Sequence, residues 1–241
     1  MKREYSQQNV YDALQDRLKF IFEEFDNIYL SFSGGKDSGL LLNLVLDYQQ
    51  KNYPSKKIGV FHQDFEAQYT VTTEYITRTF QRIKDQVEPY WICLPMATRT
   101  ALSSYEMYWY PWDDKKKESW VREMPDMDYV INLENNPMTT YHYRMHQEDL
   151  AKQFGRWYRM SHDMKKTVCL LGIRADESLQ RYSGFLNKKR DIRVNVGLQN
   201  ILKTCGVLLH CMTGVQRMFG MQTTFSSMIT IICMIYIIRL V

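Results

Sequence analysis

Residues 31–38 read Ser-Phe-Ser-Gly-Gly-Lys-Asp-Ser and stand between a short apolar run at 28–30 and an apolar-periodic stretch from Gly39 to Tyr48. This order predicts a strand, a glycine turn and a helix. Such a turn directs backbone N–H groups and a helix N-terminus at an anion. The spacing differs from a Walker A loop, which needs G-x-x-x-x-G-K-[ST]. An ordinary glycine turn between a strand and a helix is the alternative.

Each residue type in the turn suits phosphate. Gly34 and Gly35 let the backbone approach an anion without a Cβ atom in the way. Lys36 supplies a compact positive charge, and Ser33 and Ser38 supply hydroxyl donors. We therefore predict a phosphate-binding turn.

A second block follows the β-rich apolar run at 167–171 and reads Gly-Ile-Arg-Ala-Asp-Glu-Ser-Leu-Gln-Arg over 172–181. Arg174 and Arg181 offer planar, charged forks suited to phosphate or sulfate. Glu177 could orient one of them or a hydrated metal. The alternative is a surface charge network on a helix.

A third block starts with the predicted strand 57–62 and continues as Gln-Asp-Phe-Glu over 63–66. Asp64 follows the strand at its carboxyl end, where ligands of parallel sheets bind. His62 could be a ligand or an acid–base group, but a packed, hydrogen-bonded histidine is the commoner case at a strand end.

The chain alternates strands with helices, which predicts βαβ units, a parallel sheet and an α/β fold in one domain. The expected helices cover 8–25, 38–52, 68–84 and 140–162, and the expected strands cover 27–32, 57–62, 90–94 and 167–171.

The pattern breaks over about 96–140, where tyrosines and tryptophans surround the charge run at 113–118. Aromatic side chains interleaved with cations could stack the bases of a nucleic acid. They could equally form an insertion that covers the site and packs on the sheet.

Composition adds little to these motifs. A net charge of +4 is compatible with a nucleotide or nucleic-acid partner but does not require one. The N-terminal residues lack a signal-peptide pattern, so we expect a cytoplasmic protein without a membrane partner. Cys93 and Cys169 fall in predicted strands, where burial and inertness are expected.

The first block resembles the S-G-G-K-D-S signature of the PP-loop ATP pyrophosphatases. The second resembles the G-[IL]-R-x-x-E-S-x-x-R block of their phosphoadenosine phosphosulfate (PAPS) reductase branch. The resemblance as a whole covers residues 1 to about 189. The chain is most similar to the subgroup typified by immunoglobulin-binding regulator A, described as a co-activator of prophage gene expression. Its relatives include the sulfurtransferase subunit of DNA phosphorothioation systems.

The resemblance implies an adenine nucleotide α-hydrolase-like parallel sheet with helices on both faces and an aromatic-rich insertion. It also implies binding of ATP or a related adenine nucleotide, with Mg²⁺, and adenylation of a substrate with release of pyrophosphate. A partner protein in a regulatory or DNA-modification system is a further implication. The implied catalytic residues are Lys36, Asp37 and Asp64, and the implied nucleotide- and phosphate-binding residues are Ser31, Ser33, Gly34, Gly35, Lys36, Asp37, Ser38, Gly172, Arg174, Glu177, Ser178 and Arg181.

Two departures from the family bear on function. Its usual Asp-Thr-Gly turn is Asp64-Phe65-Glu66 here, so only the aspartate carries over. Its reductases use a cysteine in E-C-G-[IL]-H, which this chain lacks, so thiol-dependent PAPS reduction is not expected.

Residues 190–241 do not fit the pattern of the rest. Codons can be chosen for 190–222 so that a frame read two nucleotides later encodes Pro-Leu-Tyr-Asp-Trp-Ser-Thr-Glu-Asp-Val-Trp, a string the family carries after its second block. We therefore expect a frameshifted, non-native tail on a truncated chain, packing poorly against 1–189. A non-catalytic nucleotide-dependent regulator and an inactive truncated product are the alternatives to an active enzyme.

Overall fold

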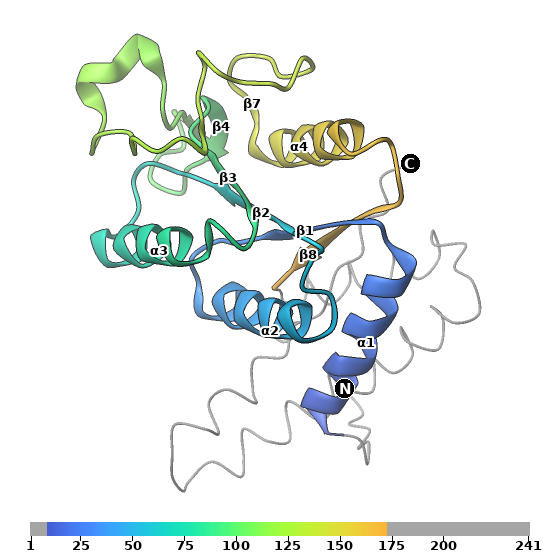
Figure 1. Ribbon diagram of the computed structural model, residues 1–241. Helices are drawn as coiled ribbons and strands as arrows, with labels where there is room; N and C mark the ends of the chain where they lie inside the picture. The colour runs from blue at the N-terminus through green and yellow to red at the C-terminus, as the bar shows by residue number, and fades with distance from the viewer. Residues whose placement is uncertain (1–8, 173–241) are drawn as a thin grey trace, which may run out of the picture. The chain divides into compact units, whose positions relative to one another are not determined.

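The computed structural model describes residues 9–172 (Figure 1). Its described residues form two compact units, one of 9–24, 36–54 and 171–172, the other of 25–35 and 55–170. Predictions about Arg174, Glu177, Ser178, Arg181 and the tail at 190–241 lie outside the described residues.

The first unit contains helices α1 (Val10–Glu24) and α2 (Lys36–Asn52). The ring of Phe22 lies 5.3 Å from that of Tyr48 and 5.1 Å from that of Tyr53, measured between centroids. Both helices match the predicted ones in position. The periodic apolar residues of α1 and α2 are buried: Leu14, Leu18, Ile21, Leu41, Leu42 and Val45.

The second unit is built on a five-stranded sheet in the order β6-β3-β2-β1-β8. β1 pairs in parallel with β2, β2 with β3, and β3 with β6. The strand bounds are β1 Asn27–Ser31, β2 Gly59–Gln63, β3 Glu88–Ile92, β6 Val130–Ile131 and β8 Thr167–Leu171.

The strand order reverses between β1 and β8. The backbone N–H of Asn27 donates to the carbonyl of Lys166 at 3.0 Å, and its Nδ2 donates to Oγ1 of Thr167 at 3.3 Å. Because these residues start β1 and precede or start β8, the two strands begin at the same edge and end at the opposite one. Such a reversal is the place where open α/β sheets bind ligands, beyond the carboxyl ends of the strands.

Helices α3 (Thr70–Ile83) and α4 (Gln147–Ser161) cover opposite faces of the sheet (Figure 1). Side chains alternate along β2 as a strand requires. Phe61 meets Phe154 of α4, with ring centroids 4.2 Å apart, whereas His62 lies 6.3 Å from Phe80 of α3. The predicted parallel sheet with helices on its faces is confirmed in these residues.

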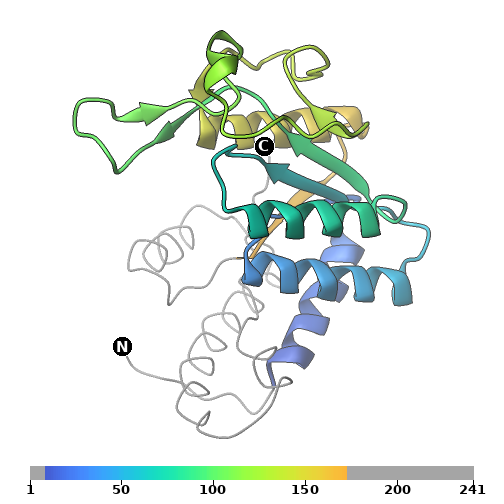
Figure 2. The same cartoon turned by 90° about the vertical axis from the view of Figure 1, so that its left-hand side faces the viewer.

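The region from 96 to 140, where the alternation of strands and helices breaks, contains strands of its own. β4 (Met96–Arg99) pairs with β5 (Tyr108–Trp109) and β7 (Met145–His146) in a second sheet. The 3₁₀ helix η1 (Asp114–Ser119) follows β5 in the chain. Figure 2 shows the β4–β5 hairpin projecting away from the main sheet. β6 also lies within this region, so its residues extend the main sheet rather than belonging only to an insertion.

No helix within residues 9–172 is both long enough and apolar enough to cross a membrane.

We predict that Phe154→Ala lowers the free energy of unfolding by about 3–5 kcal/mol, because it empties a fully buried aromatic site. Met160→Ala on the same helix changes an exposed side chain and should alter stability by less than about 0.5 kcal/mol. Urea denaturation measures both. A loss below about 1 kcal/mol for Phe154→Ala would contradict the packing of α4 on the sheet.

Candidate functional site

The glycine turn leaves the carboxyl end of β1 and leads into α2 at Lys36. Gly34 has a φ of +77°, a conformation that side-chain-bearing residues rarely adopt. A Cβ atom on Gly34 would lie 2.6 Å from Ile76 and 3.2 Å from Thr72, both in α3. Backbone conformation and packing against α3 therefore each require glycine at position 34.

Gly35 differs from Gly34 in both respects. It is exposed, its φ lies outside the left-handed region, and a Cβ atom there would meet only Ser33 Oγ among the described residues, at 3.4 Å. Nothing in the described protein therefore requires glycine at position 35.

Phe32 fixes the strand end before the turn. The N–H of Phe32 donates to the carbonyl of Phe61 at 2.8 Å. The Nδ1–H of His62 donates to the carbonyl of Phe32 at 2.8 Å. Burial lowers the pKa of His62, which keeps the ring neutral at neutral pH. His62 is thus a packed residue that holds β1 and β2 together, the commoner of the two cases that the sequence allowed.

The start of α2 divides into an exposed and a buried part. Ser33, Gly35 and Lys36 are exposed, and Lys36 Nζ lies 3.2 Å from Asp37 Oδ1 while its side chain stays 65% accessible. Asp37 and Ser38 are buried. The turn therefore presents a lysine and backbone groups to solvent, and its aspartate and second serine to the protein.

Gly172 explains part of that burial. A Cβ atom on Gly172 would lie 2.8 Å from Cα and 2.9 Å from N of Ser38. The residue after β8 thus packs directly on the backbone that starts α2, and only glycine allows this approach. The structure brings together these two predicted blocks at Ser38 and Gly172, and Ser31 is half-buried at the end of β1.

Asp64 is completely buried, and both its carboxylate oxygens have protein partners. Trp91 Nε1 donates to Oδ2 at 2.7 Å, and the N–H of Glu66 donates to Oδ1 at 2.7 Å. Nη2 of Arg122 lies 2.6 Å from each oxygen. The carboxylate therefore joins β2, β3 and the segment at 122, and its predicted catalytic role stays a prediction.

Glu66 anchors the aromatic segment, residues 105–122, in the same way. Its carboxylate accepts the N–H groups of Trp112 and Val121, each at 2.8 Å, and its carbonyl accepts Nε of Arg122 at 2.9 Å. Arg122 also stacks over the ring of Trp112, 4.8 Å from its centroid. Glu66 and Trp112 both have positive φ, which disfavours side-chain-bearing residues by about 1–2 kcal/mol each. These contacts hold that backbone in place.

Asp113 forms a second anchor within the segment. It accepts hydrogen bonds from Tyr143, Arg144 and the N–H of Lys115. Burial alone would raise the pKa of the Asp113 carboxyl, but the hydrogen bonds from Tyr143 and Arg144 lower it. Asp113 is therefore an ionised structural partner of Arg144.

The two described cysteines, Cys93 and Cys169, are free thiols and buried. Burial raises the pKa of both, with that of Cys169 at about 12. The predicted burial of these two residues is confirmed.

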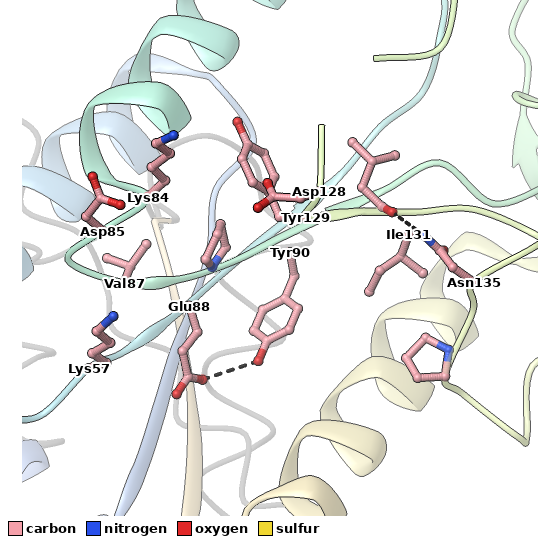
Figure 3. A pocket seen from close by; sticks show the side chains of 13 residues that line it. Lys57, Lys84, Asp85, Val87, Glu88, Tyr90, Asp128, Tyr129, Ile131 and Asn135 are labelled. Atoms are coloured by element: carbon pink, nitrogen blue, oxygen red, sulfur yellow. Dashed lines mark hydrogen bonds between the residues drawn. The ribbon is translucent and has the colours of Figure 1, made fainter. Parts of the chain in front are cut away.

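A hollow of about 590 Å³ lies at the edge of the main sheet where β3 begins, opposite to the edge from which the glycine turn leaves (Figure 3). Glu88 there accepts the hydroxyl of Tyr90 at 3.3 Å and Nε2 of His162 at 3.0 Å. Because parallel sheets bind ligands at the carboxyl ends of their strands, this amino-edge hollow is not the candidate nucleotide site.

Residues 9–172 contain no group of three or more His, Cys, Asp or Glu side chains placed to hold a metal ion. Mg²⁺ commonly binds through one or two carboxylates plus substrate phosphates. Asp37, the carboxylate within the glycine turn, is buried and lies 3.2 Å from Lys36 Nζ.

The sequence did not reveal three residues that shape this edge of the sheet. Thr72 and Ile76 confine Gly34, and Arg122 neutralises Asp64 from 58 positions further along the chain. No local pattern marks any of them, since their roles depend on tertiary contacts.

Comparison with known proteins gives one relative. The uncharacterized protein YbdN of Escherichia coli (strain K12) is 32% identical over 185 residues, which cover 76% of this chain and 43% of that protein. The chain thus spans less than half the length of this relative. No family model matches the chain, and no solved structure matches it.

We predict that Arg122→Ala destabilises the fold by about 3–5 kcal/mol, because it leaves the Asp64 carboxylate buried without its cation. Arg156→Ala, on the exposed side of α4, should change stability by less than about 0.5 kcal/mol. Equal urea midpoints for the two variants would contradict the anchoring role of Asp64.

Proposed function

We propose that the chain binds ATP through the turn Ser33–Ser38 and adenylates an acceptor oxygen with release of pyrophosphate. The turn would hold the phosphates, with backbone N–H groups and the Lys36 ammonium as donors. This is the function of a PP-loop protein of the PAPS reductase and sulfurtransferase-like family.

The observation that carries this proposal is the contrast between the two adjacent glycines. Gly34 is explained by its φ and by its contact with Ile76. Gly35 is exposed and has neither reason to be glycine among the described residues. Close approach of a ligand to its backbone supplies the missing reason.

Two further features support an anion at this place. α2 is 17 residues long and begins at Lys36, so its partial positive N-terminal end adds to the lysine charge. The turn also follows β1, next to the reversal of strand order at β8, where open α/β sheets bind ligands.

The chemistry follows from these donors. An acceptor oxygen forms a bond to the α-phosphorus of ATP while the bond from that phosphorus to the bridging oxygen breaks, and pyrophosphate leaves with the electron pair. Donors fixed before the reaction stabilise the charge that grows on the leaving group. Mg²⁺ bound to the phosphates would add to this neutralisation.

One observation favours the second candidate, a nucleotide-binding regulator without catalysis. Asp64, the acidic residue that the resemblance places near the nucleotide, has both oxygens occupied by protein donors. Release of AMP and pyrophosphate from ATP distinguishes the candidates. ATP binding without such release would favour the regulator.

We predict that Gly35→Ala weakens ATP binding at least about tenfold while changing stability by less than about 1 kcal/mol, since the added methyl meets ligand rather than protein. Lys36→Ala should also weaken binding, because it removes an exposed charge. Calorimetric titration with ATP and urea denaturation provide the two readouts.

Gly34→Ala is the matched control for stability. It should destabilise the fold by about 1–3 kcal/mol, because its φ and the 2.6 Å approach to Ile76 both resist a side chain. Folded Gly35→Ala and Lys36→Ala proteins with unchanged ATP affinity would overturn the proposed site.

A further inference from the structure

A second hollow, of about 570 Å³, lies beside the β4–β5 hairpin. Its volume falls in the range of small-molecule sites, about 300–1,000 Å³. Five aromatic residues line it: Tyr105, Tyr108, Trp109, Tyr110 and Trp120.

Two of these rings are held by contacts within the protein. Arg144 lies 4.4 Å from the centre of the Tyr110 ring. Nε1 of Trp120 donates to the carbonyl of Asp113 at 3.0 Å, which fixes the indole. The rings of Tyr110 and Trp120 are therefore held in place before any ligand arrives.

The charges around the hollow disfavour an anion. Its acidic lining residues are Glu66, Glu106 and Asp113, and Lys116 is the one basic residue among the lining side chains. Acidic residues also outnumber basic ones over 96–140. A nucleic-acid strand would bring phosphates towards carboxylates, so the predicted alternative of base stacking loses electrostatic support here.

The segment already places its own cations on aromatic rings. These pairs are Lys115 over Tyr143, Lys117 over Trp120, Arg122 over Trp112 and Arg144 over Tyr110, at 4.4–5.5 Å from the ring centroids. Among the described residues, no cation lies over Tyr105, Tyr108 or Trp109. The ring of Tyr108 packs edge-on against that of His146, with centroids 5.3 Å apart, so the rings of Tyr105 and Trp109 are the ones proposed for a ligand.

Hydrogen bonding limits which kind of ammonium group the hollow can bind. The carboxylates of Glu66 and Asp113 already accept hydrogen bonds from protein donors. A primary ammonium is strongly hydrated and needs acceptors to replace its water. A quaternary ammonium has no N–H groups and is recognised by aromatic faces alone.

We propose that this hollow binds an organic cation with a methylated ammonium group. Tyr105 and Trp109 provide the aromatic faces, and the exposed Glu106 provides a charge that attracts the cation. The cation could be free, as in choline, or carried on a methylated lysine side chain. This proposal is independent of ATP binding at the glycine turn.

The test titrates the full chain with choline and with its neutral isostere 3,3-dimethylbutanol, followed by tryptophan fluorescence and calorimetry. Choline should bind, and the isostere should bind about 2- to 30-fold more weakly, because it lacks the charge that the rings attract. A peptide with trimethyllysine, compared with the unmodified peptide, determines whether the cation can be part of a protein.

Variants identify the hollow as the place of binding. Trp109→Ala and Glu106→Gln should both weaken choline binding, whereas Tyr69→Ala and Glu134→Gln, at exposed positions outside the hollow, should not. Glu106→Gln keeps the shape of the side chain and serves if Trp109→Ala fails to fold. ATP affinity should be the same in all four.

Three results would overturn the proposal. The first is equal affinity for choline and the isostere, which would indicate an apolar hollow only. The second is no binding of any methylated ammonium probe at millimolar concentration. The third is binding of a twelve-residue oligothymidylate that Trp109→Ala abolishes, which would make the hollow a nucleic-acid site.

Discussion

The pairing of β8 beside β1 is the constraint on which the candidate nucleotide site depends. Strands β1, β2, β3 and β6 lie side by side in that order, and β8 lies on the other side of β1. Asn27 in β1 donates hydrogen bonds to Lys166 and Thr167. Both strands therefore end at the same edge. The glycine turn follows the end of β1 directly in the chain, and Gly172 follows β8.

The Asp64-Phe65-Glu66 turn follows β2, the strand next to β1, and it holds other parts of the protein in place. Asp64 holds Trp91 and Arg122, and Glu66 holds the backbone at Trp112 and Val121. Where the family resemblance implies a turn that approaches the nucleotide, this chain has a turn that anchors an aromatic segment. The positive φ of Glu66 and Trp112 is held by these hydrogen bonds, so loss of either carboxylate should loosen the whole segment.

Sequence reasoning located the long elements because each carries its own periodic pattern. α1, β1, β2 and β8 lie within about two residues of their predicted bounds, with β8 at the predicted residues. β6 was missed because two residues have no detectable period, and their pairing with Trp91 and Ile92 is non-local. The burial of Asp64 was missed because its partner Arg122 is a single residue in a segment without a regular pattern.

The most direct test of the account is a crystal structure of the chain with Mg²⁺ and α,β-methylene-ATP, which cannot release pyrophosphate. If the nucleotide binds at the glycine turn, β- and γ-phosphate oxygens should lie about 2.7–3.2 Å from backbone N–H groups of the turn Gly34–Ser38, with the Gly35 backbone in van der Waals contact with the nucleotide. A nucleotide bound instead in the hollow between Tyr105 and Trp120, or none bound at a saturating concentration, would contradict it.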